Sequence, residues 1–253
     1  MTTAVLIEQT GAVRRIRLNR PDSRNSINPE LIRALDDAVA AAMRDPGTEA
    51  VVIAGNGPSF CAGADLRHLL ELARTGGDPL AFLGSVSACF TRLESAPKPV
   101  IAAVHGHVVA GGLELALACD AVVARAGTLI GDGHIRNGLL PGAGSSVRLA
   151  RKVGDPLARR LMLTGELLPA EHFLPSGFVQ AVAGPGDFEA TVTAVADSFT
   201  GLPPGCHGRM KHLLADPGVP DALLRELDVF AEHWRERDIA AELTRFFDQR
   251  AVR

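Results

Sequence analysis

Pro99-Val-Ile-Ala-Ala-Val-His-Gly-His-Val-Val-Ala-Gly-Gly-Leu-Glu-Leu-Ala116 is the stretch that decides the fold. Its first six residues form an apolar run that predicts a buried strand, and the small residues 110–112 predict a tight turn into a helix. The N–H groups at a helix start have no partner inside the helix, so they can hold a developing negative oxygen. Glu114 follows in the first turn of a helix that is otherwise apolar.

Strands and helices alternate on both sides of this stretch. Apolar runs bounded by turn residues predict strands at residues 4–7, 13–18, 50–54, 120–124 and 128–130. Capping residues and apolar stripes predict helices that start at Asn28-Pro29, at Leu66, at Pro79 and at Ser145, with mostly helices from about residue 156. This order predicts an α/β fold with a helical C-terminal part.

Composition narrows the class of protein. The chain has 253 residues, 47% of them hydrophobic, and a formal net charge of −3, as expected for a globular protein. It lacks a long basic run and has one Trp and no Tyr, so we expect no nucleic-acid partner and no tyrosine acting as an acid or oxyanion donor. No apolar run reaches membrane-spanning length and the N-terminus lacks signal-peptide features, so we expect no membrane partner.

The four cysteines form no C-x-x-C pair and have no histidine at metal-ligand spacing. We therefore expect reduced thiols, no metal site and a cytoplasmic location.

A second glycine turn lies in Ser59-Phe-Cys-Ala-Gly-Ala-Asp-Leu66. Gly63 relaxes the backbone and lets the Ala64 N–H point into a cleft at the start of a helix. The alternative is an ordinary tight turn in which Asp65 caps that helix. The role of Glu114 is also undecided at this point, because its carboxylate either takes part in catalysis or faces solvent at a helix end.

A third segment is Gly131-Asp-Gly-His-Ile-Arg-Asn-Gly-Leu-Leu-Pro-Gly-Ala-Gly144. In an extended chain Asp132 and His134 share one face, so His134 is a candidate base oriented by Asp132. On spacing alone, a polar loop whose side chains cap turns is the better interpretation.

These segments resemble, in order and spacing, the crotonase or enoyl-CoA hydratase/isomerase superfamily, roughly over residues 5–183. The matching motifs are Leu18-Asn-Arg-Pro21, Phe60-Cys-Ala-Gly-Ala-Asp-Leu66, Lys98 to Gly106, Gly111-Gly-Leu-Glu-Leu-Ala116, Gly138-Leu-Leu-Pro-Gly-Ala-Gly144 and Leu163-Thr-Gly165.

The resemblance implies a crotonase-like spiral of ββα repeats over residues 1–198 and a helical trimerisation region over 199–253. It implies a homotrimer or homohexamer that acts on acyl-CoA, with coenzyme A as part of the substrate and no permanently bound cofactor. The thioester oxygen would be held by the backbone N–H groups of Ala64 and Gly111, and the family's first catalytic glutamate maps to Glu114. Coenzyme A-binding positions map to Arg24, Cys61, Ala62, Ala64, Asp65, Leu66 and Phe246.

Two departures from the family pattern change the expectation. The hydratases carry a second glutamate four residues before the glycine of the Gly-Leu-Leu-Pro-Gly motif, and this chain has His134 there. A lysine that meets a coenzyme A phosphate near Phe246 is replaced by Gln249, with Arg250 beside it.

Four functions remain open at this point. We favour an enoyl-CoA hydratase or dehydratase that forms a thioester enolate, with Glu114 and His134 as its catalytic side chains. An isomerase using either side chain and a C–C or thioester hydrolase with His134-activated water are the alternatives within the superfamily. A non-catalytic acyl-CoA-binding protein is the alternative of another class.

Overall fold

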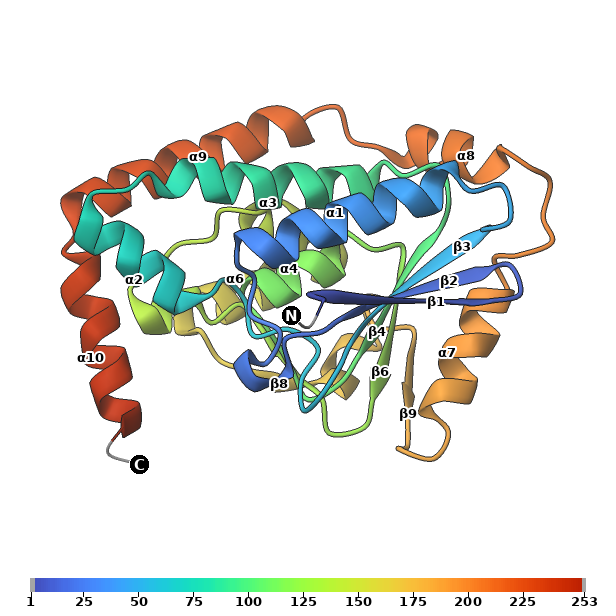
Figure 1. The fold of residues 1–253 in the computed structure, drawn as a ribbon, viewed down its shortest axis with the longest axis horizontal. Helices are drawn as coiled ribbons and strands as arrows, with labels where there is room; N and C mark the ends of the chain where they lie inside the picture. Colours follow the sequence, from blue (N-terminus) through green and yellow to red (C-terminus); the bar gives the residue numbers. More distant parts are fainter. Residues whose placement is uncertain (1–2, 252–253) are drawn as a thin grey trace.

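The computed structural model describes residues 3–251 and is built around a six-stranded sheet (Figure 1). The strand order in this sheet is β1-β2-β3-β4-β6-β9. Its strands are β1 (Val5–Thr10), β2 (Val13–Leu18), β3 (Ala50–Gly55), β4 (Val100–Val104), β6 (Ala121–Arg125) and β9 (Ala181–Ala183). β1 and β2 form an antiparallel hairpin, and all other neighbours run parallel. β3 and β4 are buried along their whole length, which explains their continuous apolar sequences.

A second, three-stranded sheet lies beside the first. It contains β5 (His107–Val109), β7 (Leu129–Gly131) and β8 (Leu168–Pro169) in that order. The chain passes from β4 in the large sheet to β5 in the small one and then into a helix, and it passes from β6 to β7 in the same way. β5 and β7 are therefore each followed by a bend and the start of a helix, α4 after β5 and a short 3₁₀ helix after β7.

Ten helices surround the sheets within the described residues. They are α1 (Pro29–Arg44), α2 (Leu66–Thr75), α3 (Pro79–Glu94), α4 (Gly111–Leu117), α5 (Ser145–Val153), α6 (Asp155–Thr164), α7 (Phe188–Asp197), α8 (Cys206–Leu214), α9 (Val219–Glu236) and α10 (Ile239–Ala251). α1 begins as predicted, with the Asn28 side chain accepting the Leu31 N–H at 2.9 Å, and it buries Leu31, Leu35 and Val39.

The helices form a cover on both faces of the large sheet. The main core packs beneath α1, α3 and α4, and a smaller apolar cluster lies under α7 on the other face. Figure 1 shows α9 running alongside α3, and α10 descending next to α2 at the end of the molecule opposite α7. The C-terminal helices thus pack directly over the spiral, and the predicted α/β fold with C-terminal helices is confirmed.

Three local features were not predicted by the sequence. Ser145 is the first residue of α5 and not its cap, which is Gly144, and the Ser145 hydroxyl has no hydrogen-bond partner in the described chain. β8 and β9 interrupt the region expected to be helical, because strands of two and three residues are too short to show a periodic pattern. His134 begins a short 3₁₀ helix, His134–Asn137, and does not lie in an extended segment.

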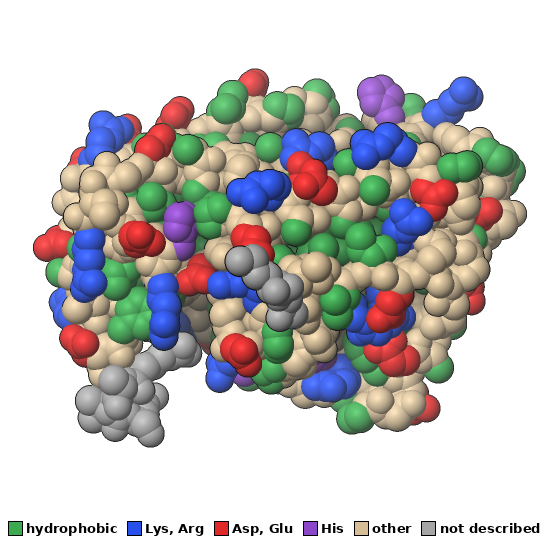
Figure 2. Space-filling view, in the orientation of Figure 1, with side chains coloured by type: hydrophobic (Ala, Val, Ile, Leu, Met, Phe, Trp, Pro, Cys, Tyr) green, Lys and Arg blue, Asp and Glu red, His purple; other side chains and the backbone are tan. Residues whose placement is uncertain are grey.

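The surface carries mixed charge. Lysine and arginine side chains alternate with aspartate and glutamate over the face shown in Figure 2. Within residues 3–251, no helix has both the length and the apolar character needed to span a bilayer. Residues 1–2 and 252–253, and the side chain of Arg250, lie outside what the structure describes, so the expectations that fall on them remain predictions.

Candidate active site

The turn after β3 places Ala64 beside the start of α4. Gly63 has φ +95°, and a Cβ there would lie 2.9 Å from the Ala110 Cβ and 3.2 Å from the Gly111 nitrogen. Only glycine permits this approach. On the other side, the Ile27 N–H donates to the Gly63 carbonyl at 2.8 Å. These contacts hold the Ala64 amide against the second turn.

The second turn carries backbone strain where the site needs it. Ala110 has φ +53° and ψ −119°, a region that residues with a side chain rarely occupy. Its N–H donates to the Gly131 carbonyl at 3.3 Å, which ties the turn to β7. α4 then begins at Gly111, so the Gly111 N–H is one of the unpaired donors of a helix start.

Two main-chain donors thus face one cavity. Neither the Ala64 nor the Gly111 N–H donates a hydrogen bond to any acceptor within residues 3–251. Both residues line a cavity of about 60 Å³, which Glu114 and His134 also line. A buried N–H without an acceptor is costly, so two of them beside one cavity indicate a site built for an anionic or polar oxygen.

Glu114 is buried, not solvent-facing, with 2% of its surface exposed. Its Oε1 accepts N–H groups from Ala143 at 2.9 Å and from Ser145 at 3.1 Å, both at the start of α5. Its Oε2 lies 4.0 Å from the His134 Nε2. Burial raises the pKa of Glu114 to about 7, against the lowering influence of His134 and the two amides.

Asp132 and His134 form a hydrogen-bonded pair next to this carboxylate. Gly133 has a positive φ of +67°, and the resulting turn brings the His134 Nδ1 to 3.0 Å from the Asp132 Oδ2. Burial lowers the pKa of His134, but the charge and hydrogen bond of Asp132, together with Glu114, more than compensate and raise it to about 9. At neutral pH His134 is therefore an imidazolium that presents Nε2–H to the cavity. The segment is a turn, as the spacing favoured, and within it the two side chains form the pair that an extended chain was the alternative route to.

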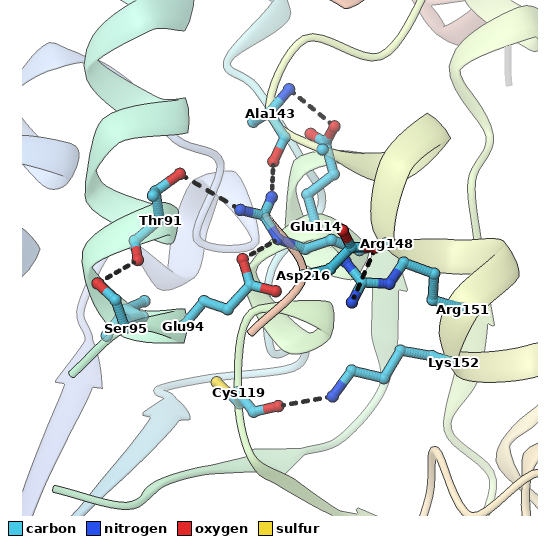
Figure 3. A network of polar contacts seen from close by, with 12 residues as sticks. Thr91, Glu94, Ser95, Glu114, Cys119, Ala143, Arg148, Arg151, Lys152 and Asp216 are labelled. Atoms are coloured by element: carbon cyan, nitrogen blue, oxygen red, sulfur yellow. Dashed lines mark hydrogen bonds and ion pairs between the residues drawn. The ribbon is translucent and has the colours of Figure 1, made fainter. Parts of the chain in front are cut away.

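Arg148 supports the loop that holds Glu114 (Figure 3). It is 1% exposed, and its guanidinium donates to the Ala143 carbonyl at 2.9 Å and pairs with Glu94 on α3 at 2.9 Å. Arg148 thus holds the carbonyl of the same residue whose N–H donates to Glu114.

Apolar side chains close the rest of the cavity. They come from α2, α3, the loop before α5 and α9, and they are Leu69, Leu83, Val86, Leu139 and Phe230.

The residues predicted to bind coenzyme A divide into two groups. Ala62, Ala64 and Leu66 line the cavity. The others do not: Arg24 is exposed, Cys61 is buried in the core, Asp65 pairs with Arg20 and caps α2, and Phe246 lies on α10 beside Phe247. Their coenzyme A roles remain predictions.

Sequence reasoning missed three residues of the site, namely Arg148, Glu226 and Phe230. Each reaches the site through tertiary packing, and no local motif marks them. Among residues 3–251, no three His, Cys, Asp or Glu side chains gather in a way that suits a metal ion.

The ββα spiral and its donor-lined cavity define the crotonase class of α/β proteins. A family model described as enoyl-CoA hydratase/isomerase matches residues 8–251, and the chain belongs to this family of enzymes. It is 36% identical over 253 residues to a putative enoyl-CoA hydratase of Thermus thermophilus, covering 97% of this chain and 98% of the relative. It is 30% identical over 252 residues to a short-chain-enoyl-CoA hydratase of Clostridium acetobutylicum, covering 98% and 96%. The crystal structure of an enoyl-CoA hydratase from Mycobacterium avium subsp. paratuberculosis superposes with a TM-score of 0.86 at 28% identity, covering 96% of this chain and 99% of that one.

Proposed function

We propose that this enzyme adds water to 2-enoyl-CoA thioesters and catalyses the reverse dehydration. One observation carries the proposal: two amide donors without acceptors, Ala64 and Gly111, face the same small cavity as a buried carboxylate and an imidazolium. A thioester oxygen fits the first pair of groups, and proton transfer to and from water and carbon fits the second.

The reaction follows from the protonation states of the two side chains. Glu114, as the carboxylate, takes a proton from water while the water oxygen attacks the β-carbon. The electron pair of the double bond moves onto the thioester oxygen, where the Ala64 and Gly111 amides stabilise the enolate. The His134 imidazolium then gives its Nε2 proton to the α-carbon, and the product is a 3-hydroxyacyl thioester.

The site is reset by one proton transfer. After turnover Glu114 holds a proton and His134 is neutral, and their facing atoms are separated by 4.0 Å. A small closure or one bridging water returns the proton to Nε2. Asp132 stabilises the imidazolium at both ends of the cycle through its hydrogen bond to Nδ1.

The charge of His134 favours hydration over hydrolysis. A hydrolase of the kind considered from the sequence needs neutral His134 to take a proton from water. The raised pKa of about 9 makes this side chain an acid at neutral pH, and leaves the base role to Glu114. A simple binding protein would gain nothing from a buried carboxylate and a buried imidazolium, each of which costs free energy to desolvate.

The remaining expectations extend this proposal. Ala62 and Leu66 contact coenzyme A on either side of the Ala64 amide, supported by their place on the cavity wall. Residues 199–253 form the trimerisation region of a homotrimer or homohexamer, and they also complete the site by supplying Phe230. No permanent cofactor takes part in the proposed steps. The buried free thiols Cys61, Cys89 and Cys119 support a reducing, cytoplasmic setting.

Crotonyl-CoA incubated with purified protein tests the function. Hydration removes the absorbance of the conjugated thioester and adds the mass of water to the product. A 3-enoyl thioester that gains this absorbance would identify an isomerase, and free coenzyme A or a new carboxylate would identify a hydrolase. Intact substrates together with a melting temperature raised by coenzyme A would replace the proposal with a binding protein.

A further inference from the structure

Four consecutive backbone amides, residues 143–146, donate alternately to two carboxylates. The first and third donate to Oε1 of Glu114 at 2.9 and 3.1 Å. The second donates to Oε1 of Glu226 at 2.6 Å, and the fourth donates to its Oε2 at 2.9 Å. Glu226 lies on α9 and is 6% exposed. The start of α5 is thus held by two buried carboxylates that belong to helices far apart in the sequence.

One face of α9 is directed at this loop. Phe230 follows Glu226 by four residues and lines the catalytic cavity, and His233 follows by seven with its Nε2 at 2.7 Å from the Gly138 carbonyl. Residues four and seven apart lie on the same side of a helix. Phe230 and His233 therefore fix the position and rotation of α9, and with it the position of Glu226.

A charged residue at this place needs an explanation beyond helix capping. Within the described chain, Glu226 has no Lys, Arg or His at ion-pair distance, and it lies close enough to Glu114 to disfavour ionisation of that carboxylate. A buried carboxylate beside another is costly, and amides can be capped by a neutral side chain at lower cost.

We propose that Glu226 is a positioning residue for Glu114. Glu226 holds the amides of residues 144 and 146, so that the amides of residues 143 and 145 orient Oε1 of Glu114 and leave its Oε2 facing His134. The inference rests on the proposed function. Glu226 does not touch the reacting atoms, and it acts through the loop and through its charge.

Its charge has a second, measurable effect. Glu226 raises the pKa of Glu114, after the larger effect of burial, and it is among the groups that raise the pKa of His134. The other groups that face Glu114 are the imidazolium of His134 with its partner Asp132, the un-ionised thiol of Cys61, and Arg148 through the Ala143 carbonyl. Removing the charge of Glu226 therefore lowers both pKa values.

The test is the pH profile of Glu226→Gln with crotonyl-CoA. Activity requires Glu114 deprotonated and His134 protonated, so these pKa values set the acid and alkaline limbs. We expect both limbs to move to lower pH, by about half a pH unit or more, with kcat reduced ~10-fold and KM little changed. Glu232→Gln, an exposed position on the same helix, makes the same charge change and should leave both limbs in place. A uniform loss of rate with unmoved limbs would mark a structural role only and overturn the proposal.

Two further measurements keep the inference separate from folding and from the proposed function. Glu226→Asp keeps the charge but withdraws it by one methylene, so kcat should fall while the limbs stay; wild-type kcat would overturn the positioning role. If the wild-type protein does not hydrate crotonyl-CoA, the proposed function fails. The carboxyl of Glu114 can still be titrated by ¹³C NMR, with its signal assigned through Glu114→Gln. An equal midpoint in wild-type and Glu226→Gln protein would then overturn the inference.

Discussion

A methyl group at position 111 should abolish the chemistry and leave the fold intact. A Cβ built on Gly111 lies 3.4 Å from the Ala64 nitrogen, in the space between the two proposed oxyanion donors. It lies 3.2 Å from Cδ1 of Ile27, the end of a flexible side chain that can yield by a few tenths of an ångström. Gly111→Ala therefore narrows the space beside the Ala64 amide, where we propose that the thioester oxygen binds, and its Cβ meets no backbone atom closer than 3.4 Å.

The substitution should change stability little and the catalytic rate greatly. Gly111 is the first residue of α4 and has no positive φ, so alanine fits its conformation and changes stability by less than about 1 kcal/mol. That corresponds to a shift in melting temperature of no more than about 4 °C for a chain of this size. Loss of one oxyanion donor costs about 3–4 kcal/mol of transition-state stabilisation, and displacing the oxygen from both donors costs at least as much. We expect kcat to fall by at least ~10²-fold.

The assay compares hydration of crotonyl-CoA with thermal unfolding of the same sample. Gly112→Ala is the matched control, because a Cβ there would lie 2.2 Å from the Cys61 carbonyl oxygen, and this overlap disrupts packing instead of the cavity. We expect the control to lower the melting temperature strongly. A folded Gly111→Ala enzyme with wild-type kcat would refute the assignment of Ala64 and Gly111 as the oxyanion donors.

Three more predictions address the side chains of the site. Glu114→Gln keeps an oxygen for the Ala143 and Ser145 amides but cannot take a proton, so turnover of crotonyl-CoA should fall at least ~100-fold while ligand binding, measured by calorimetry, stays nearly unchanged. Asp132→Asn removes the charge that raises the pKa of His134, so the alkaline limb of the rate profile, near pH 9 in the wild type, should move to lower pH. Phe230→Ala enlarges a cavity of about 60 Å³, so kcat/KM for longer 2-enoyl chains relative to crotonyl-CoA should rise about tenfold or more.

Each of these has an outcome that contradicts it. Wild-type turnover in Glu114→Gln would remove that residue from the mechanism. An alkaline limb that stays in place in Asp132→Asn would mean that another group sets it. For Phe230→Ala, loss of a buried ring costs about 3–5 kcal/mol, so chain-length preference is compared only in protein shown to be folded by circular dichroism. An unchanged preference in that protein would place the limit on acyl length elsewhere.

The sequence was sufficient to predict those parts of the site that are formed by short, continuous segments of backbone. The apolar strands, the glycine turns at 63 and 111–112, and the placement of Glu114 one turn into α4 all follow from short motifs. The contact between Asp132 and His134 was considered only for an extended chain, and spacing favoured a polar loop; a positive φ at Gly133 brings the two side chains together within such a turn.

Tertiary packing supplied what no motif could. Glu226 meets the Gly144 amide across 82 positions of sequence, and its neighbours on α9 give no hint of a buried carboxylate. Burial of Glu114 was undecidable from sequence for the same reason, since the amides that donate to its carboxylate lie at and just before the start of another helix, α5. The short strands β8 and β9 exist because neighbouring strands pair with them, not because of their own residues.

His134 stands where the resemblance places the hydratases' second glutamate. The net charge of the site explains how a histidine can take this place, provided that Asp132 is included in the count. Two glutamates in an apolar site share one proton, because like charges so close together do not both ionise, and their net charge is −1. When Glu114 is ionised, as the proposed reaction requires, it contributes −1, the His134 imidazolium +1 and Asp132 −1, which again gives −1. In the mechanism that we propose, the same single proton is available for transfer to carbon, carried on Nε2 of His134. Without Asp132 the burial of His134 would lower its pKa and expel that proton, so the histidine can replace the acid only in company with the aspartate two residues before it.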